Sequence, residues 1–231
     1  MMSLSPAPAF LPTPPVGATT PRPLATPAPM QGCNTAACYW QTLPTQQLNS
    51  FIALPMAQVA GLPQADQLKL LTAQRLATEE VMKRGQGNYA SLKALAQVVG
   101  SPAKASQPLA VQQAVTVNRQ AALWALAWLN RQQVLASPQV MPLGLDVVAS
   151  VLRHPQESVA VQVTAMQTAR LWLLPTAKGA GEVQMAKGVK QLFTLGEQSP
   201  YLAVRLQAKA GLANLPLPAP TGLVQRQAWQ A

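Results

Sequence analysis

The chain has 231 residues, of which 49% are hydrophobic and only 10% are charged, whereas an average soluble domain has about 25% charged residues. This length suits one domain with tails, or at most two small domains, and the hydrophobic content is sufficient for a sizeable core. The excess of 17 basic over 7 acidic side chains gives a net charge of +10, which favours nucleic acid, anionic lipid or an acidic protein surface as partner. No stretch reaches the roughly 18 consecutive apolar residues of a transmembrane helix, so we predict no membrane-spanning segment.

The first region, residues 1–45, is a proline-rich arm. Proline fixes φ and lacks an amide donor, so we predict an extended, polyproline-like segment that is disordered when alone. The arm has one charged residue, Arg22, and carries the apolar residues Phe10 and Leu11. This composition suits a strap that lies on a partner surface, and a passive tail is the alternative. The start of the chain lacks the basic region of a signal peptide, which favours a cytoplasmic protein.

Two cysteines, Cys33 and Cys38, lie close together in this arm. They could close a small disulfide loop, which would indicate an exported or periplasmic protein, or remain free thiols in a cytosol. A zinc site needs about four ligands. The single histidine, His154, lies far along the chain, so we expect no metal site.

Helical spacing begins after the arm, and residues 46–85 are expected to form an N-terminal helical cap. Apolar residues recur every three or four positions from Leu48, and Pro55 should interrupt this first helix. A second helix is expected over about 65–84, with Gly85 as its C-terminal cap.

Residues 86–215 then alternate between helical segments and short breaks. The expected helices cover about 89–99, 109–129, 143–153, 157–173, 183–195 and 200–214. Several breaks contain Ser-Pro, as at Ser199-Pro200, where serine can cap the new helix and proline is tolerated at its first position. We find no alternating strand pattern, so the sequence predicts an all-α fold.

The second helices of these pairs resemble one another in sequence. Four residues of one second helix have a counterpart 44 residues later: Val115 matches Val159, Ala121 matches Ala165, Ala125 matches Ala169 and Trp128 matches Trp172. A further 45 residues along, Val159 and Ala165 are matched by Val204 and Ala210. A period near 45 residues with two helices per unit is typical of HEAT and armadillo arrays.

Residues 147–165 carry the resemblance best. This unit is similar to a HEAT repeat, with an apolar first helix, a turn containing Pro155 and small alanines along the second helix. The unit around Val204-Arg205 matches nearly as well, whereas the first unit departs because its break is too long. The resemblance covers about residues 90–215.

This resemblance implies a HEAT-like α-solenoid of antiparallel helix pairs over residues 86–215. Residues 216–231 would then form a C-terminal tail. Stacked pairs bury one another's apolar faces and offer a curved surface to a partner. In such a stack we expect Trp124, Trp128 and Trp172 to fill the core.

The sequence gives no reason to expect catalysis or a cofactor. General acid–base chemistry usually needs a histidine or paired carboxylates. His154 directly precedes a proline in a turn, the seven acidic residues are scattered, and no phosphate-binding glycine loop is present. We therefore predict no enzymatic activity and no catalytic residue.

The favoured interpretation is a protein-binding scaffold or structural subunit of a larger assembly. Aromatic and large apolar side chains in the tails are the expected docking anchors, namely Phe10, Leu11, Tyr39, Trp40 and Trp229. The alternative is a nucleic-acid-binding HEAT-like protein with a basic concave face. Its phosphate contacts would be Lys93, Lys104, Arg119, Arg131, Arg153 and Arg205.

Overall fold

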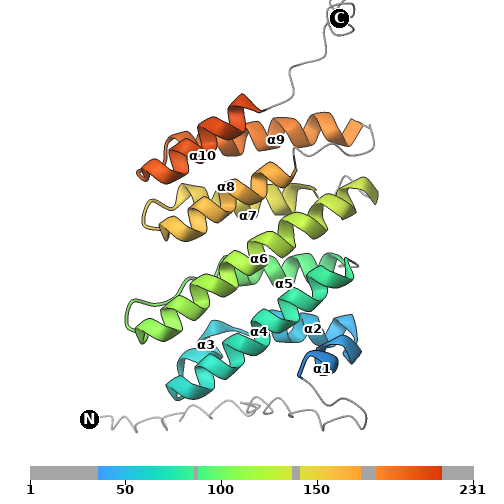
Figure 1. Cartoon of the computed structure of the whole chain (residues 1–231), viewed down its shortest axis with the longest axis vertical. Helices are drawn as coiled ribbons and strands as arrows, with labels where there is room; N and C mark the ends of the chain where they lie inside the picture. Colours follow the sequence, from blue (N-terminus) through green and yellow to red (C-terminus); the bar gives the residue numbers. More distant parts are fainter. Residues whose placement is uncertain (1–35, 86–87, 137–140, 173–179, 215–231) are drawn as a thin grey trace, which may run out of the picture.

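A computed structural model describes residues 36–85, 88–136, 141–172 and 180–214 (Figure 1). Within these ranges the chain is all-helical, which confirms the predicted fold class. The helices are α1 Ala36–Thr42, α2 Thr45–Ile52, α3 Met56–Ala60, α4 Gln64–Arg84, α5 Tyr89–Val99, α6 Leu109–Ala136, α7 Met141–Arg153, α8 Val159–Leu171, α9 Ala180–Glu197 and α10 Leu202–Ala213. None of the helices in this part of the chain is long and apolar enough to cross a bilayer.

Most helix boundaries lie close to those expected from the sequence. Pro55 separates α2 from α3, and α5 spans the predicted 89–99. The C-terminal cap of α4 is Gly85 in the left-handed conformation, with φ of 61°, which glycine adopts without a steric cost. At α5 the Asn88 side chain accepts a hydrogen bond from the amide of Ser91, which completes a capping box.

Helix α1 differs from the expectation. It lies inside residues 1–45, which we expected to be extended, and that expectation fails for residues 36–42. The segment between Pro29 and Pro44 contains no proline, so nothing in its composition prevents a helical turn. Residues 1–35 of the predicted arm and the predicted tail 216–231 lie outside the described residues.

The helices pack in two layers (Figure 1). One layer places α4, α6, α8 and α10 side by side, and the other places α2, α5, α7 and α9 side by side. Each helix of the pairs α5–α6, α7–α8 and α9–α10 also contacts its own partner across the two layers. A continuous hydrophobic core fills the space between the layers and contains Leu92, Leu126 and Phe193, each fully buried.

Buried positions recur at regular intervals along α4, α6, α8 and α10. Buried positions recur after 44 residues from α4 to α6 and after 43 residues from α6 to α8 and from α8 to α10. One such row comprises Thr78, Ala122, Ala165 and Ala208, all at most 2% exposed. The small side chains of this row let adjacent helices approach closely.

This register corrects the alignment made from the sequence, which paired Trp128 with Trp172. Trp172 is 6% exposed and Trp128 is 40% exposed, so they do not occupy equivalent positions. The buried counterpart of Trp172 is Leu129, which is fully buried. An error of one residue rotates every position by about 100° around the helix, which exchanges core positions for surface positions.

A candidate docking face and the polar seam behind it

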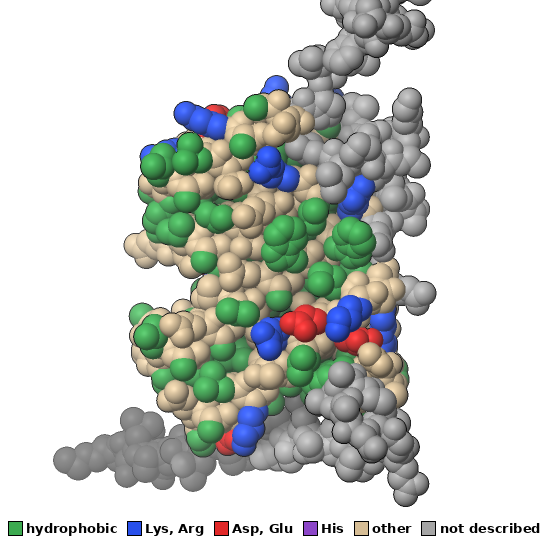
Figure 2. All heavy atoms as spheres, viewed as in Figure 1, with side chains coloured by type: hydrophobic (Ala, Val, Ile, Leu, Met, Phe, Trp, Pro, Cys, Tyr) green, Lys and Arg blue, Asp and Glu red, His purple; other side chains and the backbone are tan. Residues whose placement is uncertain are grey.

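Large hydrophobic side chains are exposed mainly on one layer. Nine large hydrophobic side chains are exposed among the described residues, and seven of them lie on three helices. These seven are Leu109, Val117, Trp124 and Trp128 on α6, Val159 on α8, and Leu202 and Leu206 on α10. We call the exposed surface of α6, α8 and α10 the docking face. Figure 2 shows this layer toward the viewer, with hydrophobic side chains spread over it. The exposed positions of α5, α7 and α9 are mostly polar, as at Lys93, Ser150 and Lys190.

The two tryptophans of α6 lie on the docking face because the inward positions of this helix are occupied by other residues. Leu123, Leu126 and Leu129 are fully buried, whereas Trp124 is 37% exposed. The expectation that Trp124 and Trp128 fill the core is therefore wrong. It is right for Trp172, whose indole Nε1–H donates to the carbonyl of Ala127 at 3.0 Å.

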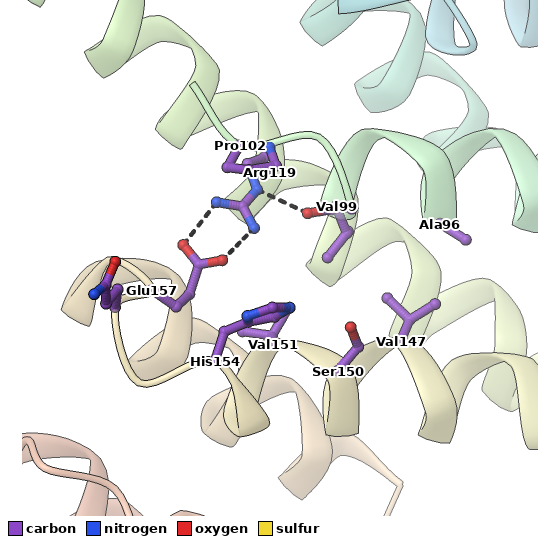
Figure 3. Close-up of a pocket in the computed structure, with 11 residues that line it drawn as sticks. Ala96, Val99, Pro102, Arg119, Val147, Ser150, Val151, His154 and Glu157 are labelled. Atoms are coloured by element: carbon purple, nitrogen blue, oxygen red, sulfur yellow. Dashed lines mark hydrogen bonds and ion pairs between the residues drawn. The ribbon is translucent and has the colours of Figure 1, made fainter. Parts of the chain in front are cut away.

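Behind the face, where each helix pair turns, lies a seam of buried polar side chains. The Arg119 guanidinium forms two hydrogen bonds with the Glu157 carboxylate, at 2.7 and 2.5 Å, and a third with the carbonyl of Val99 at 2.7 Å (Figure 3). The two side chains are 5% and 9% exposed. Burial alone would raise the pKa of Glu157, but the hydrogen bonds and charge of Arg119 hold that pKa below its ordinary value.

The same position recurs 43 residues later at Gln162 and again at Arg205. Gln162 donates to the carbonyl of His154 at 2.8 Å, and its side-chain oxygen accepts from the Ser199 hydroxyl at 2.8 Å. Arg205 donates to the carbonyls of Ser199 and Pro200, both at 2.9 Å. Arg119 and Gln162 therefore each join the turn of their own helix pair to the turn of the next.

Ser199 has a different role from the one we expected. The sequence suggested that its hydroxyl caps the following helix, but α10 begins after Tyr201 and has no side-chain cap. The hydroxyl instead bonds to Gln162 in the adjacent unit. The capping role fails because the helix starts later than Pro200.

A cavity of about 420 Å³ lies beside the Arg119–Glu157 pair. Figure 3 shows Val147 and Ser150 of α7, with His154 just after its end, on one side and Ala96 and Val99 of α5 on the other. The Glu157 carboxylate in its wall is engaged by Arg119. No cluster of metal-ligating side chains is found in the part of the chain that the structure describes.

The predicted docking anchors in the tails are only partly covered by the structure. Trp40 is 9% exposed and packs edge-on against Phe51, with ring centroids 5.2 Å apart, so it is a core residue rather than an anchor. The Arg84 guanidinium holds α1 in place through the carbonyls of Trp40 and Leu43, at 3.0 and 2.8 Å. Tyr39 is half-buried beside Trp40. Phe10, Leu11, Cys33 and Trp229 lie outside the described residues, whereas Cys38 belongs to α1.

The predicted nucleic-acid contacts do not form one surface. Arg119 is buried in its ion pair and cannot reach a phosphate, which corrects that assignment. Lys93 and Arg153 belong to α5 and α7, whereas Arg131 and Arg205 belong to α6 and α10 in the other layer. Lys104 is exposed in the loop between α5 and α6.

Two features escaped the sequence analysis, namely the docking face and the polar seam. The spacing of Arg119, Gln162 and Arg205 at 43 residues was a signal for the seam. The absence of any Asp or Glu from the segments that form α6, α8 and α10 was a signal for the face.

No family model, curated protein or solved structure matches this chain.

Proposed function

We propose that the chain is a HEAT-like array of helix pairs that binds another protein without catalysing a reaction, as a scaffold or subunit of a larger assembly. The layered packing of successive helix pairs and their spacing of 43 to 44 residues support the HEAT-like assignment. The polar seam supports it as well, because bonds such as Gln162–Ser199 join one unit to the next.

The observation that carries the proposal is the gathering of exposed apolar side chains on one layer. Isolated exposed hydrophobic residues are normal, but a set that shares one surface marks an interaction site. Trp124 and Trp128, at 37% and 40% exposed, are the strongest anchors, because tryptophan is enriched among the residues that dominate interface energy.

The absence of catalysis is part of the same proposal. The cavity next to α7 has apolar walls over most of its extent, and the carboxylate in its wall is bound to Arg119. General acid–base chemistry would need that carboxylate to exchange a proton freely near neutral pH, whereas its lowered pKa keeps it ionised.

The test is affinity capture of the full chain from extract of its own cells, with and without nuclease. The face variant Trp124→Gln/Trp128→Gln is compared with Tyr89→Gln, which removes an aromatic that is 52% exposed on the other layer. We expect a stoichiometric protein partner that survives nuclease, is retained by Tyr89→Gln and is lost by the face variant. Thermal unfolding verifies that both variants are folded.

Two results would contradict the proposal. A partner held equally by the wild type and the face variant would move the interaction to another surface. Nucleic acid alone in the eluate, released by salt, would favour the alternative function.

A further inference from the structure

We infer that the protein segment bound by the docking face is acidic as well as apolar; this rests on the proposed function. The three helices that form the face contain no Asp or Glu. They carry Arg170 on α8 and Arg205 and Lys209 on α10, whereas Arg119 of α6 is neutralised by Glu157. The face therefore has an excess of positive charge around its apolar side chains.

Helix α4, in the same layer, does not share this excess. Each of its three carboxylates pairs with a basic residue of the same helix, in the pairs Lys69–Asp66, Arg75–Glu79 and Arg84–Glu80. The charge on α4 is thus largely balanced locally. Beyond α4 the basic side chains of this layer have no acidic neighbour on their own helix.

Arg170 of the face and Arg205 of the seam behind it are hydrogen-bonded only to neutral acceptors. Arg170 donates to the side-chain oxygen of Gln207 at 3.2 Å, which links α8 to α10. Arg205 donates to the carbonyls of Ser199 and Pro200. Both are half-buried, so their charge is partly desolvated without a carboxylate to balance it. A carboxylate supplied by a partner would add a charge-assisted bond, which is about twice as strong as a neutral one.

The chain itself is a poor source of that carboxylate. Residues 1–35 and 215–231 contain no Asp or Glu, so neither terminal segment complements the charge of the face. Asp66, Glu79, Glu80 and Glu157 are already in ion pairs. The other acidic residues belong to α7 and α9 in the opposite layer, namely Asp146, Glu182 and Glu197. The occupant that fits is therefore a different protein.

Phosphate groups would also satisfy the charge, but they leave the apolar residues unexplained. Leu202 and Leu206 are 62% and 57% exposed, and Val117 is 44% exposed. Aliphatic side chains gain from burial against other apolar groups, at about 25 cal/mol per Å². A phosphodiester backbone offers no such surface, so a peptide with leucine, phenylalanine or tryptophan next to carboxylates fits better.

The experiment selects binders from a displayed library of random peptides of about 16 residues, long enough for an amphipathic helix. The library is panned on the full chain after removal of clones that bind the variant Trp124→Gln/Trp128→Gln. We expect the recovered peptides to be enriched both in Asp or Glu and in bulky apolar residues.

Synthetic peptides from these clones are then measured against two charge variants. We expect Arg170→Gln/Lys209→Gln to weaken binding at least tenfold, about 1.4 kcal/mol. The matched control Lys93→Gln/Lys190→Gln removes two exposed lysines from the other layer and should change affinity less than twofold. Because Lys209 is exposed, Lys209→Glu alone provides a second variant with little risk to folding.

Each contrary outcome has a distinct meaning. Peptides that depend on the tryptophans but lack acidic residues would overturn the inference and leave the proposed function standing. Failure to recover any tryptophan-dependent peptide would overturn both. Two other results would also overturn the inference. One is a single-stranded oligonucleotide that binds the wild type but not the tryptophan variant. The other is self-association in sedimentation that the wild type shows and the tryptophan variant does not.

Discussion

The layer of α5, α7 and α9 and the layer of α6, α8 and α10 are built from the same helix pairs, yet they present different surfaces. Exposed positions in the first layer include Lys93, Ser150 and Lys190. Exposed positions in the second include Trp124 and Leu202. Both layers bury apolar residues against one core, so the demands of folding do not account for the difference. The difference is what we expect if, as proposed, the outer residues of α6, α8 and α10 bind a partner.

The largest expected effect on stability is the difference between replacing a tryptophan of the core and replacing one of the docking face. Trp172→Ala should lower the free energy of unfolding by about 4 kcal/mol, since it removes a buried ring and its hydrogen bond to Ala127. Trp128→Ala should cost only about 1–2 kcal/mol, because its side chain already contacts solvent. Urea unfolding of both variants measures the difference. Equal losses would show that the two residues are equivalent and that the 43-residue register is incorrect.

The second prediction concerns the seam behind the face. Glu157→Ala should destabilise the fold by about 3 kcal/mol or more, because it leaves the buried Arg119 charge without its partner. The exposed pair Arg75–Glu79, at 3.8 Å, provides the control, and Glu79→Ala should cost less than about 0.5 kcal/mol. Similar small losses in both variants would mean that Arg119 is readily solvated.

The same pair predicts a dependence on pH. The pKa of Glu157 is lower in the folded chain than in the unfolded chain, so its stabilising contribution is complete above the ordinary carboxyl pKa and is lost as pH falls through the lowered value. The stability difference between wild type and Glu157→Gln should therefore shrink from pH 7 to pH 3. A constant difference across this range would contradict the assignment of the lowered pKa.

The smallest expected effect lies at the start of the first layer's helix α5. Asn88→Ala removes the side chain that accepts from the Ser91 amide and should cost about 1 kcal/mol. Because this cap is on α5, in the other layer, partner binding should be unchanged while the melting temperature falls. A loss of binding in a folded Asn88→Ala protein would show that the two layers are energetically coupled.

The sequence predicted most helices and their ends well, but it predicted poorly which side of each helix faces the core. Proline and glycine act locally, so Pro55 and Gly85 marked real helix ends. Which side of α6 faces the core depends on how α4 and α8 pack against it, and local periodicity contains little of that information. The alanines of α6 and α8 can be aligned at a spacing of 43 or 44 residues almost equally well. The spacing of 44 residues paired Trp128 with Trp172 and so placed Trp128 in the core.

The candidate site was less predictable than the fold. Arg119 looked like a surface cation because its partner Glu157 lies 38 residues away in the next helix pair. Trp40 was predicted to be an exposed anchor because the proline-rich composition of the arm indicated an extended segment. It belongs instead to a short helix, and its ring packs against Phe51. In both cases a contact distant in sequence decided whether the side chain was buried.

The most direct test of the docking face is hydroxyl-radical footprinting of the full chain, free and in complex with the captured protein partner. Oxidation of Trp124 and Trp128 should fall strongly on binding, whereas Tyr89 on the other layer should remain as reactive as in the free chain. Trp172 provides an internal reference, because it is buried in both states. Unchanged oxidation of Trp124 and Trp128 together with protection of Tyr89 would contradict the account and assign binding to the layer of α5, α7 and α9.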